Sequence, residues 1–286
     1  MSFYPQPNEW TCGPFALKHA LIALGRVANG EELAKLAHSH WWSGTDEIRL
    51  ARAAHAYDCE LVGHRVRSPE KARALLQSHL KQKLPVLLCV DDWEHWIVVL
   101  ARQKDNFVLI DSLLEPVLQV VSWSQLHRRW RYLDLDYDED EPPELYEMYP
   151  LVPRSQHTIR ANFSVARTRF LRRPENQALA EHWNDYLDDL LAVCRPRSPN
   201  QVARQSMAEF LRRNQKLLLD RVEYWHGDVT RAELVKLLKN YRFVAETYGL
   251  VIPGAAARRA IIDMAVLTTM WASAKHGLGE MYGEGV

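Results

Sequence analysis

Near its N-terminus the chain reads Gln6-Pro-Asn-Glu-Trp-Thr-Cys12-Gly-Pro-Phe-Ala-Leu17, and apolar residues continue to Leu24. Their spacing predicts a helix over residues 12–25 with the thiol of Cys12 at its N-terminal end. That end carries partial positive charge from backbone N–H groups without partners, and this charge favours a thiolate over a thiol. The stretch therefore predicts both a packed helix and a reactive sulfur.

Helix and strand patterns alternate through the rest of the first half. Short apolar runs predict buried strands at 85–90, 95–101 and 107–111. The polar connection 102–106 is short, which is typical of an antiparallel hairpin. Further helices are predicted at 30–38, 46–57 and 69–82, and further strands at 59–66 and 117–121. We therefore expect an α+β fold in which helices pack on a mainly antiparallel sheet.

The second half has a different pattern. An acidic stretch with several Pro and Tyr residues runs from Asp134 to Pro153 without periodicity, which predicts a linker or surface loop. Helical patterns follow at 160–172, 175–194, 199–224, 229–247 and 254–276. We expect two domains: an α+β domain over 1–153 with the acidic linker at its end, and an all-α helical bundle over 154–286 that binds substrate or a partner.

Charge is unevenly distributed along a chain whose formal net charge is zero. Residues 1–159 hold 17 Lys and Arg against 22 Asp and Glu, whereas residues 160–286 hold 19 against 14. The basic helical part suits an acidic protein partner or the acidic first half, and ordinary solvated helix faces explain it as well. Because the chain as a whole has no net charge, its charge gives no argument for nucleic acid as a partner.

The sequence also bears on compartment and cofactors. No segment approaches the ~20 consecutive apolar residues of a membrane-spanning helix, and the first residues lack the pattern of a secretory signal. The thiols are far apart and form no CxxC pair, which favours reduced cysteines over disulfides or a zinc site. They are Cys12, Cys59, Cys89 and Cys194. We expect a cytoplasmic protein without membrane insertion, metal or cofactor.

A thiolate nucleophile needs a base, a group that orients the base, and donors for the oxyanion. His95 begins one predicted strand and Asp111 ends the next, so an antiparallel hairpin places the two side chains side by side. Gln6 can donate from its amide beside the sulfur, together with the backbone N–H of Cys12. The first half thus holds a candidate for every catalytic group.

Taken singly, these residues have plainer interpretations. A free cysteine is among the most buried residue types, so Cys12 alone would be interpreted as a core thiol. Asp91 and Asp92 lie just before His95 and compete with Asp111 as the orienting acid. A set of tryptophans lines either an apolar substrate groove or the core. They are Trp10, Trp41, Trp42, Trp93 and Trp96.

The order of the candidate residues resembles the papain-like cysteine peptidases, most closely the C39 type. The matching elements are Gln6, the helix-opening Cys12-Gly13, a strand that begins His95-Trp-Ile-Val-Val and an Ile-Asp111 strand. The resemblance covers roughly residues 4–130. It implies that Cys12 is the nucleophile, His95 the general base and acid, Asp111 the residue that orients His95, and Gln6 an oxyanion donor.

The chain also departs from that family. C39 enzymes cleave after a Gly-Gly pair in bacteriocin leader peptides, usually as a domain of a membrane transporter, yet this sequence has no transporter helices and no GxxxxGK[ST]. Thr11 stands where the family often carries an acidic residue. We expect a thiol hydrolase that cleaves a peptide or isopeptide bond in a peptide or protein. The alternatives are acyl transfer or amide hydrolysis on a non-peptide substrate, or a catalytically idle binding module.

Overall fold

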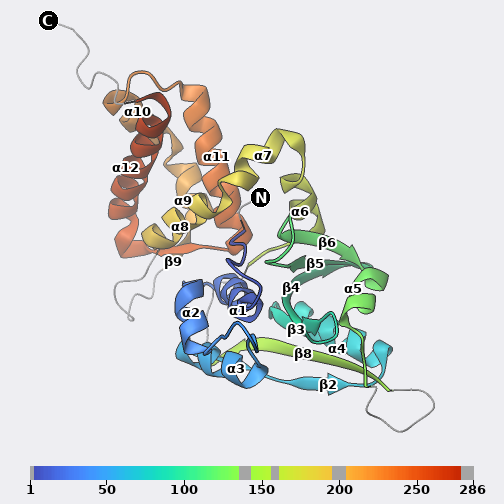
Figure 1. The fold of residues 1–286 in the computed structure, drawn as a ribbon. Helices are drawn as coiled ribbons and strands as arrows, with labels where there is room; N and C mark the ends of the chain where they lie inside the picture. The colour runs from blue at the N-terminus through green and yellow to red at the C-terminus, as the bar shows by residue number, and fades with distance from the viewer. Residues whose placement is uncertain (1–2, 135–142, 156–160, 195–203, 278–286) are drawn as a thin grey trace, which may run out of the picture. The chain divides into compact units, whose positions relative to one another are not determined.

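The computed structural model describes the whole chain apart from residues 1–2, 135–142, 156–160, 195–203 and 278–286 (Figure 1). By its internal contacts the chain divides into two compact units, Met1–His182 and Trp183–Val286. The domain boundary after residue 153, and the roles of the two parts, remain predictions. None of the helices in the described residues is long and apolar enough to cross a membrane.

An antiparallel sheet forms the centre of the first unit. Its strands run in the order β1-β8-β3-β4-β5-β6, and β2 and β7 also pair with β8. The bounds are β1 Cys59–Leu61, β2 His64–Val66, β3 Val86–Val90, β4 His95–Gln103, β5 Asn106–Ile110, β6 Leu118–Ser122, β7 Tyr132–Leu133 and β8 Glu144–Pro153. The predicted hairpin of β4 and β5 is present, with Val98 opposite Ile110.

Helices pack on this sheet, which confirms the α+β class. α1 packs on β3 and β4 and also contacts α2 and α3, beside which it lies in Figure 1. α4 and α5 bury a core against the sheet that includes Leu76, Ile97, Trp130 and Tyr146. The bounds are α1 Cys12–Ala23, α2 Gly30–Leu36, α3 Glu47–Ala56, α4 Pro69–Lys81, α5 Trp123–Trp130, α6 Val165–Leu171, η1 Pro174–Asn176 and α7 Gln177–Glu181.

Strand β8 corrects the linker that we predicted over 134–153. Residues 135–142 lie outside the described part, but Glu144–Pro153 is a ten-residue strand that pairs with β1, β2, β3 and β7. Most of its residues are apolar and buried whichever face they point to, and the acidic residues before it hid that pattern. Its buried Glu147 pairs with Arg65. The single strand predicted at 59–66 is likewise two short strands, β1 and β2.

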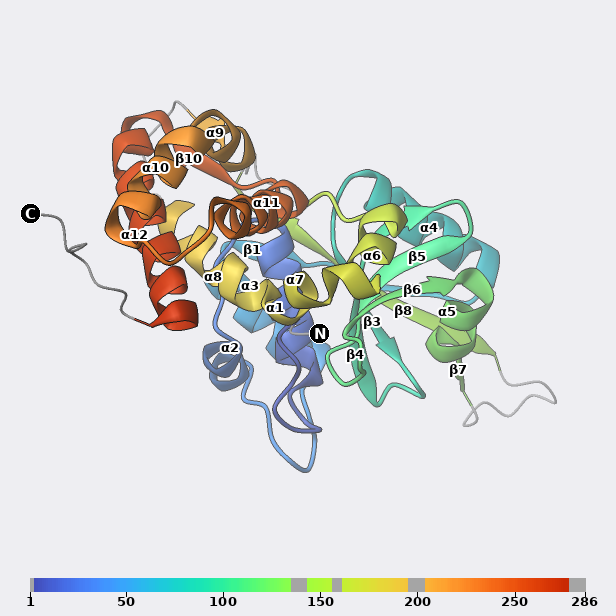
Figure 2. The ribbon, with the colours of Figure 1, turned by 90° about the horizontal axis from the view of Figure 1, so that it is seen from above.

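The second unit is mainly helical, as predicted for this part of the chain (Figure 2). A capping box of Thr230 and Glu233 begins α11, and Gly249, with a φ of 60°, ends it. The sequence pattern missed the antiparallel pair β9 and β10. The single helices predicted over 175–194 and 199–224 are each divided into shorter elements, and β9 lies within the second range. The bounds are α8 Trp183–Cys194, β9 Arg204–Ser206, α9 Met207–Arg213, α10 Gln215–Trp225, α11 Arg231–Tyr248, β10 Val251–Pro253, η2 Gly254–Ala256 and α12 Ala257–His276.

Candidate active site

Cys12 is the first residue of α1, and the backbone around it leaves donors beside the sulfur. The N-cap residue Thr11 makes no side-chain capping bond, and the N–H of Phe15 donates to the carbonyl of Thr11 at 3.1 Å. Pro14 has no N–H. Only the N–H groups of Cys12 and Gly13 therefore remain without an acceptor inside the first turn. The helix dipole makes this a favourable place for negative charge.

Gly13 lets the helix of Cys12 approach the strand of His95. A Cβ on Gly13 would lie 3.2 Å from the side chain of Leu50 on α3 and 3.3 Å from that of Trp96 on β4. Such contacts are tighter than most real packing, so a larger residue would push α1 away. Trp96 itself is fixed because its Nε1 donates to the carbonyl of Thr45 at 2.9 Å.

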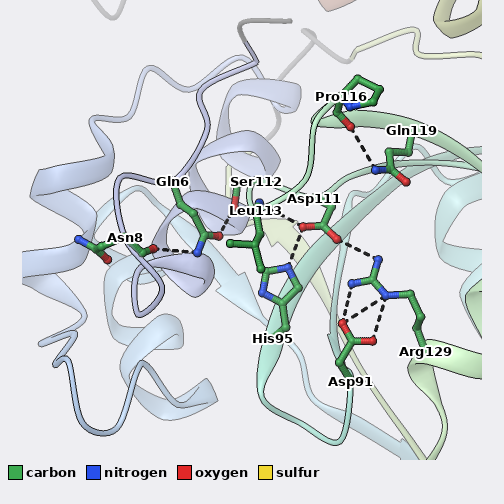
Figure 3. Close-up of polar contacts among 10 residues, drawn as sticks. All are labelled: Gln6, Asn8, Asp91, His95, Asp111, Ser112, Leu113, Pro116, Gln119 and Arg129. Carbon is green, nitrogen blue, oxygen red and sulfur yellow. Dashed lines mark hydrogen bonds and ion pairs between the residues drawn. The ribbon is translucent and has the colours of Figure 1, made fainter.

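His95 joins Cys12 to Asp111. Its Nε2 lies 2.8 Å from Oδ1 of the fully buried Asp111 (Figure 3), and the side chain of Cys12 is near enough to raise the pKa of the ring. Since Nε2 faces the carboxylate, the nitrogen toward the thiol is Nδ1. Burial alone would lower the pKa of His95, but the hydrogen bonds and charges of Asp111 and Cys12 outweigh it and raise the pKa to about 9.

Arg129 on α5 extends this chain of polar groups, and the sequence pattern did not reveal it. Its Nη1 donates to Oδ2 of Asp111 at 2.9 Å, and its Nε and Nη2 donate to the carboxylate of Asp91 at 3.0 and 2.6 Å (Figure 3). Burial opposes ionisation of Asp111, but His95 and Arg129 together hold its pKa below the usual value. Asp91 thus pairs with Arg129, and Asp111 is the acid on His95.

The turn between β3 and β4 is strained directly before His95. Asp91, Asp92 and Trp93 have φ values of 55°, 57° and 67°, a region that residues other than glycine rarely adopt. The turn is held from outside, because the N–H of Asp91 donates to the Arg129 carbonyl at 2.7 Å and the ring of Trp93 stacks on Tyr132 at 3.8 Å. Held strain of this kind is common at functional sites.

Gln6 is fixed next to Asp111 through Ser112. Its N–H donates to the Ser112 carbonyl at 3.0 Å, and the hydroxyl of Ser112 donates to its Oε1 at 2.8 Å. Its Nε2 donates to the carbonyl of Asn8 at 2.8 Å (Figure 3), which uses one of the two N–H groups of the amide. A hydrogen bond among the described residues thus joins His95 to Asp111, and Gln6 is bonded to Ser112, the residue that follows Asp111.

The other candidate thiols and the candidate tryptophans do not share the properties of this cluster. Burial raises the pKa of Cys59 to about 11 and that of Cys194 to about 12, and it also raises the pKa of Cys89, so these thiols stay protonated. The tryptophans do not share one environment, because Trp96 is buried while Trp41 and Trp42 are 73% and 66% exposed. Within the described ranges, no three His, Cys, Asp or Glu side chains converge as metal ligands.

No family model and no curated protein matches the chain. Solved structures with a similar fold include the peptidase domain of Streptococcus ComA, a bi-functional ABC transporter involved in quorum sensing. That match has 16% identity, covers 52% of this chain and 96% of that chain, and has a TM-score of 0.40. A double glycine motif protease from an AMS/PCAT transporter, in complex with the leader peptide, matches at 16% identity with 52% and 89% covered and a TM-score of 0.39. The peptidase domain of Streptococcus mutans ComA matches at 15%, with 54% and 100% covered and a TM-score of 0.35.

Proposed function

We propose that the chain is a papain-like thiol hydrolase that cleaves a peptide or isopeptide bond. The observation that carries this proposal is the buried His95 ring, which hydrogen-bonds Asp111 through Nε2 and whose pKa the nearby Cys12 side chain helps to raise. In this proposal Cys12 is the nucleophile, His95 the general base and acid, and Asp111 the group that fixes the tautomer of His95.

The reaction begins with a proton on His95. In this proposal the ring, whose pKa is raised to about 9, holds the proton that Cys12 gives up before the attack. The sulfur attacks the carbonyl carbon, and the resulting oxyanion accepts hydrogen bonds from the N–H of Cys12 and from the second amide N–H of Gln6. Asp111 stabilises the imidazolium throughout this step.

Collapse of the tetrahedral intermediate breaks the C–N bond. His95 gives its proton to the leaving amine, which departs and leaves a thioester on Cys12. Water then attacks the thioester while His95 takes one of its protons. The C–S bond breaks, the acid product leaves, and His95 again carries the proton opposite the thiolate.

Profiling of N-termini tests the proposal. Wild type, Cys12→Ala and, as a matched control, Cys59→Ala are each incubated with a cell lysate, and new α-amino groups and newly freed lysine side chains are counted by mass spectrometry. We expect new amines with wild type and with Cys59→Ala, and none with Cys12→Ala. Identical amine profiles from wild type and Cys12→Ala contradict a peptidase or isopeptidase.

A further inference from the structure

An open apolar groove lies between two helices of the second unit. α10 and α12 pack against each other, and a cavity of about 870 Å³ opens along them. Side chains spaced four residues apart line it from each helix. They are Leu217, Arg221 and Trp225 on α10, and Ile262, Val266 and Met270 on α12.

α12 is apolar on two faces, and only one of them is covered. Ala260, Met264, Thr268 and Ala272 face the interior of the unit and are at most 2% exposed. On the groove side Ile262, Val266 and Met270 are 56%, 51% and 63% exposed. A helix that is apolar on both faces is normally covered on both, and contiguous exposed apolar surface marks an interaction site.

The spacing of the lining residues specifies the shape of the occupant. The groove extends along α12 from Arg258 to Ser273, which at ~1.5 Å per residue is about four helical turns. Apolar side chains at every third or fourth position match the ridges of another α-helix. A helix of about 16 residues with one apolar face therefore fits the groove.

The charge of the groove distinguishes a foreign partner from a second copy of this chain. Arg221 and Arg258 line it, and none of its lining residues is acidic. A second copy would bring its own Arg221 and Arg258 to the same interface, where like charges repel. We propose that the α10–α12 groove binds an amphipathic helix of a partner protein, with acidic residues beside its apolar face.

Two synthetic peptides test this inference on the full chain. One is a fluorescein-labelled helix of about 18 residues with leucines at three- and four-residue spacing and glutamates beside them, and the other has lysines in place of the glutamates. By fluorescence anisotropy, we expect the glutamate peptide to bind on the order of tenfold more tightly than the lysine peptide.

Charge reversals locate the binding. Arg221→Glu and Arg258→Glu should each weaken binding of the glutamate peptide by about fivefold and strengthen binding of the lysine peptide. Met270→Glu should weaken binding of both peptides. Lys216→Glu, an exposed cation on α10 that does not line the groove, is the matched control and should change neither. Thermal unfolding of each variant verifies that it is folded.

Three results overturn the inference. The first is that neither peptide binds, and the second is that both bind equally in wild type and in Arg221→Glu. The third is a dimer in light scattering that Met270→Glu dissociates, which would assign the groove to a second copy of the chain.

Discussion

Arg129 donates a hydrogen bond from Nη1 to Oδ2 of Asp111 at 2.9 Å, and Oδ1 of the same carboxylate faces His95. The guanidinium also binds Asp91, the first residue of the strained turn before His95. One side chain on α5 therefore contacts both the acid at the end of β5 and the turn that begins β4. In the proposed mechanism Arg129 is a positioning residue.

Replacing Arg129 should shift the pH dependence of the reaction. In Arg129→Met the buried Asp111 loses a cation, so its pKa rises and the acid limb of the pH–rate profile moves to higher pH. We also expect kcat to fall by about tenfold or more, because the carboxylate is no longer oriented. The assay uses a peptide identified by the N-terminal profiling.

Two further variants test the specificity of that effect. Arg129→Lys keeps the charge and should restore the acid limb, but not the full kcat, because an ammonium lacks the planar fork that holds two carboxylates. Arg128→Met, at the exposed neighbouring position on α5, is the matched control. Superimposable profiles of Arg129→Met and Arg128→Met would exclude a positioning role.

The ring of His95 should titrate well above an ordinary histidine. Its pKa is raised from 6.5 to about 9, so NMR of the ring C–H signals should give a midpoint near pH 9 in the wild type. Asp111→Asn removes the negative partner, and Cys12→Ala removes the thiol, so each should lower the midpoint. A wild-type midpoint at or below 6.5 contradicts the described site.

The same shift affects stability. Because the folded-state pKa of His95 is higher than its unfolded value, its contribution is complete below about pH 6.5 and is lost as the pH rises through about 9. Urea unfolding between pH 6 and pH 10 should therefore show a larger loss of stability in the wild type than in Asp111→Asn. Parallel losses in the two proteins would contradict the linkage.

Gln6→Glu tests the proposed oxyanion donor. The substitution keeps the shape of the side chain but replaces the donating amide with an anion that cannot stabilise an oxyanion. We expect kcat to fall by about 10²–10³-fold, while the rate at which a small reagent alkylates Cys12 changes little. Equal losses of both rates would indicate a disturbed site rather than a missing donor.

Leu151→Ala tests the structural role of β8. Leu151 is fully buried opposite Leu61 of β1, so truncation should lower the free energy of unfolding by about 2–5 kcal/mol. The control is Leu113→Ala, because Leu113 is 55% exposed in the same unit, and a change within about 0.5 kcal/mol is expected there. Urea unfolding measures the free energy of unfolding of both variants. Equally small changes in the two would indicate a linker at 144–153 and contradict a buried strand.

The residues that could be placed from the sequence lie at the ends of elements with clear periodicity. Cys12 begins an apolar helix, His95 begins an apolar strand, and the strand before Asp111 is short and continuous. In each case the local pattern determines the element, and the end of the element determines the position of the side chain. The α+β class followed from the same patterns.

Two features could not be predicted because they depend on tertiary contacts. Arg128 and Arg129 are adjacent, and only the packing of α5 determines that Arg129 reaches Asp111, 18 residues away in sequence. Strand β8 pairs with β1, β2 and β3 across long sequence separations, so its partners are not visible locally. The local composition therefore favoured a linker there, whereas pairing with the other strands of the sheet makes the segment a strand.

Alkylation of the native protein by iodoacetamide at pH 6.5 tests the central claim most directly, with the modified cysteine identified by mass spectrometry. If His95 holds the Cys12 proton, Cys12 should react first, and roughly tenfold or more faster than in His95→Ala. Cys59, Cys89 and Cys194, whose thiol pKa is raised by burial, should remain unmodified. A Cys12 that reacts no faster in the wild type than in His95→Ala would contradict the proposed nucleophile.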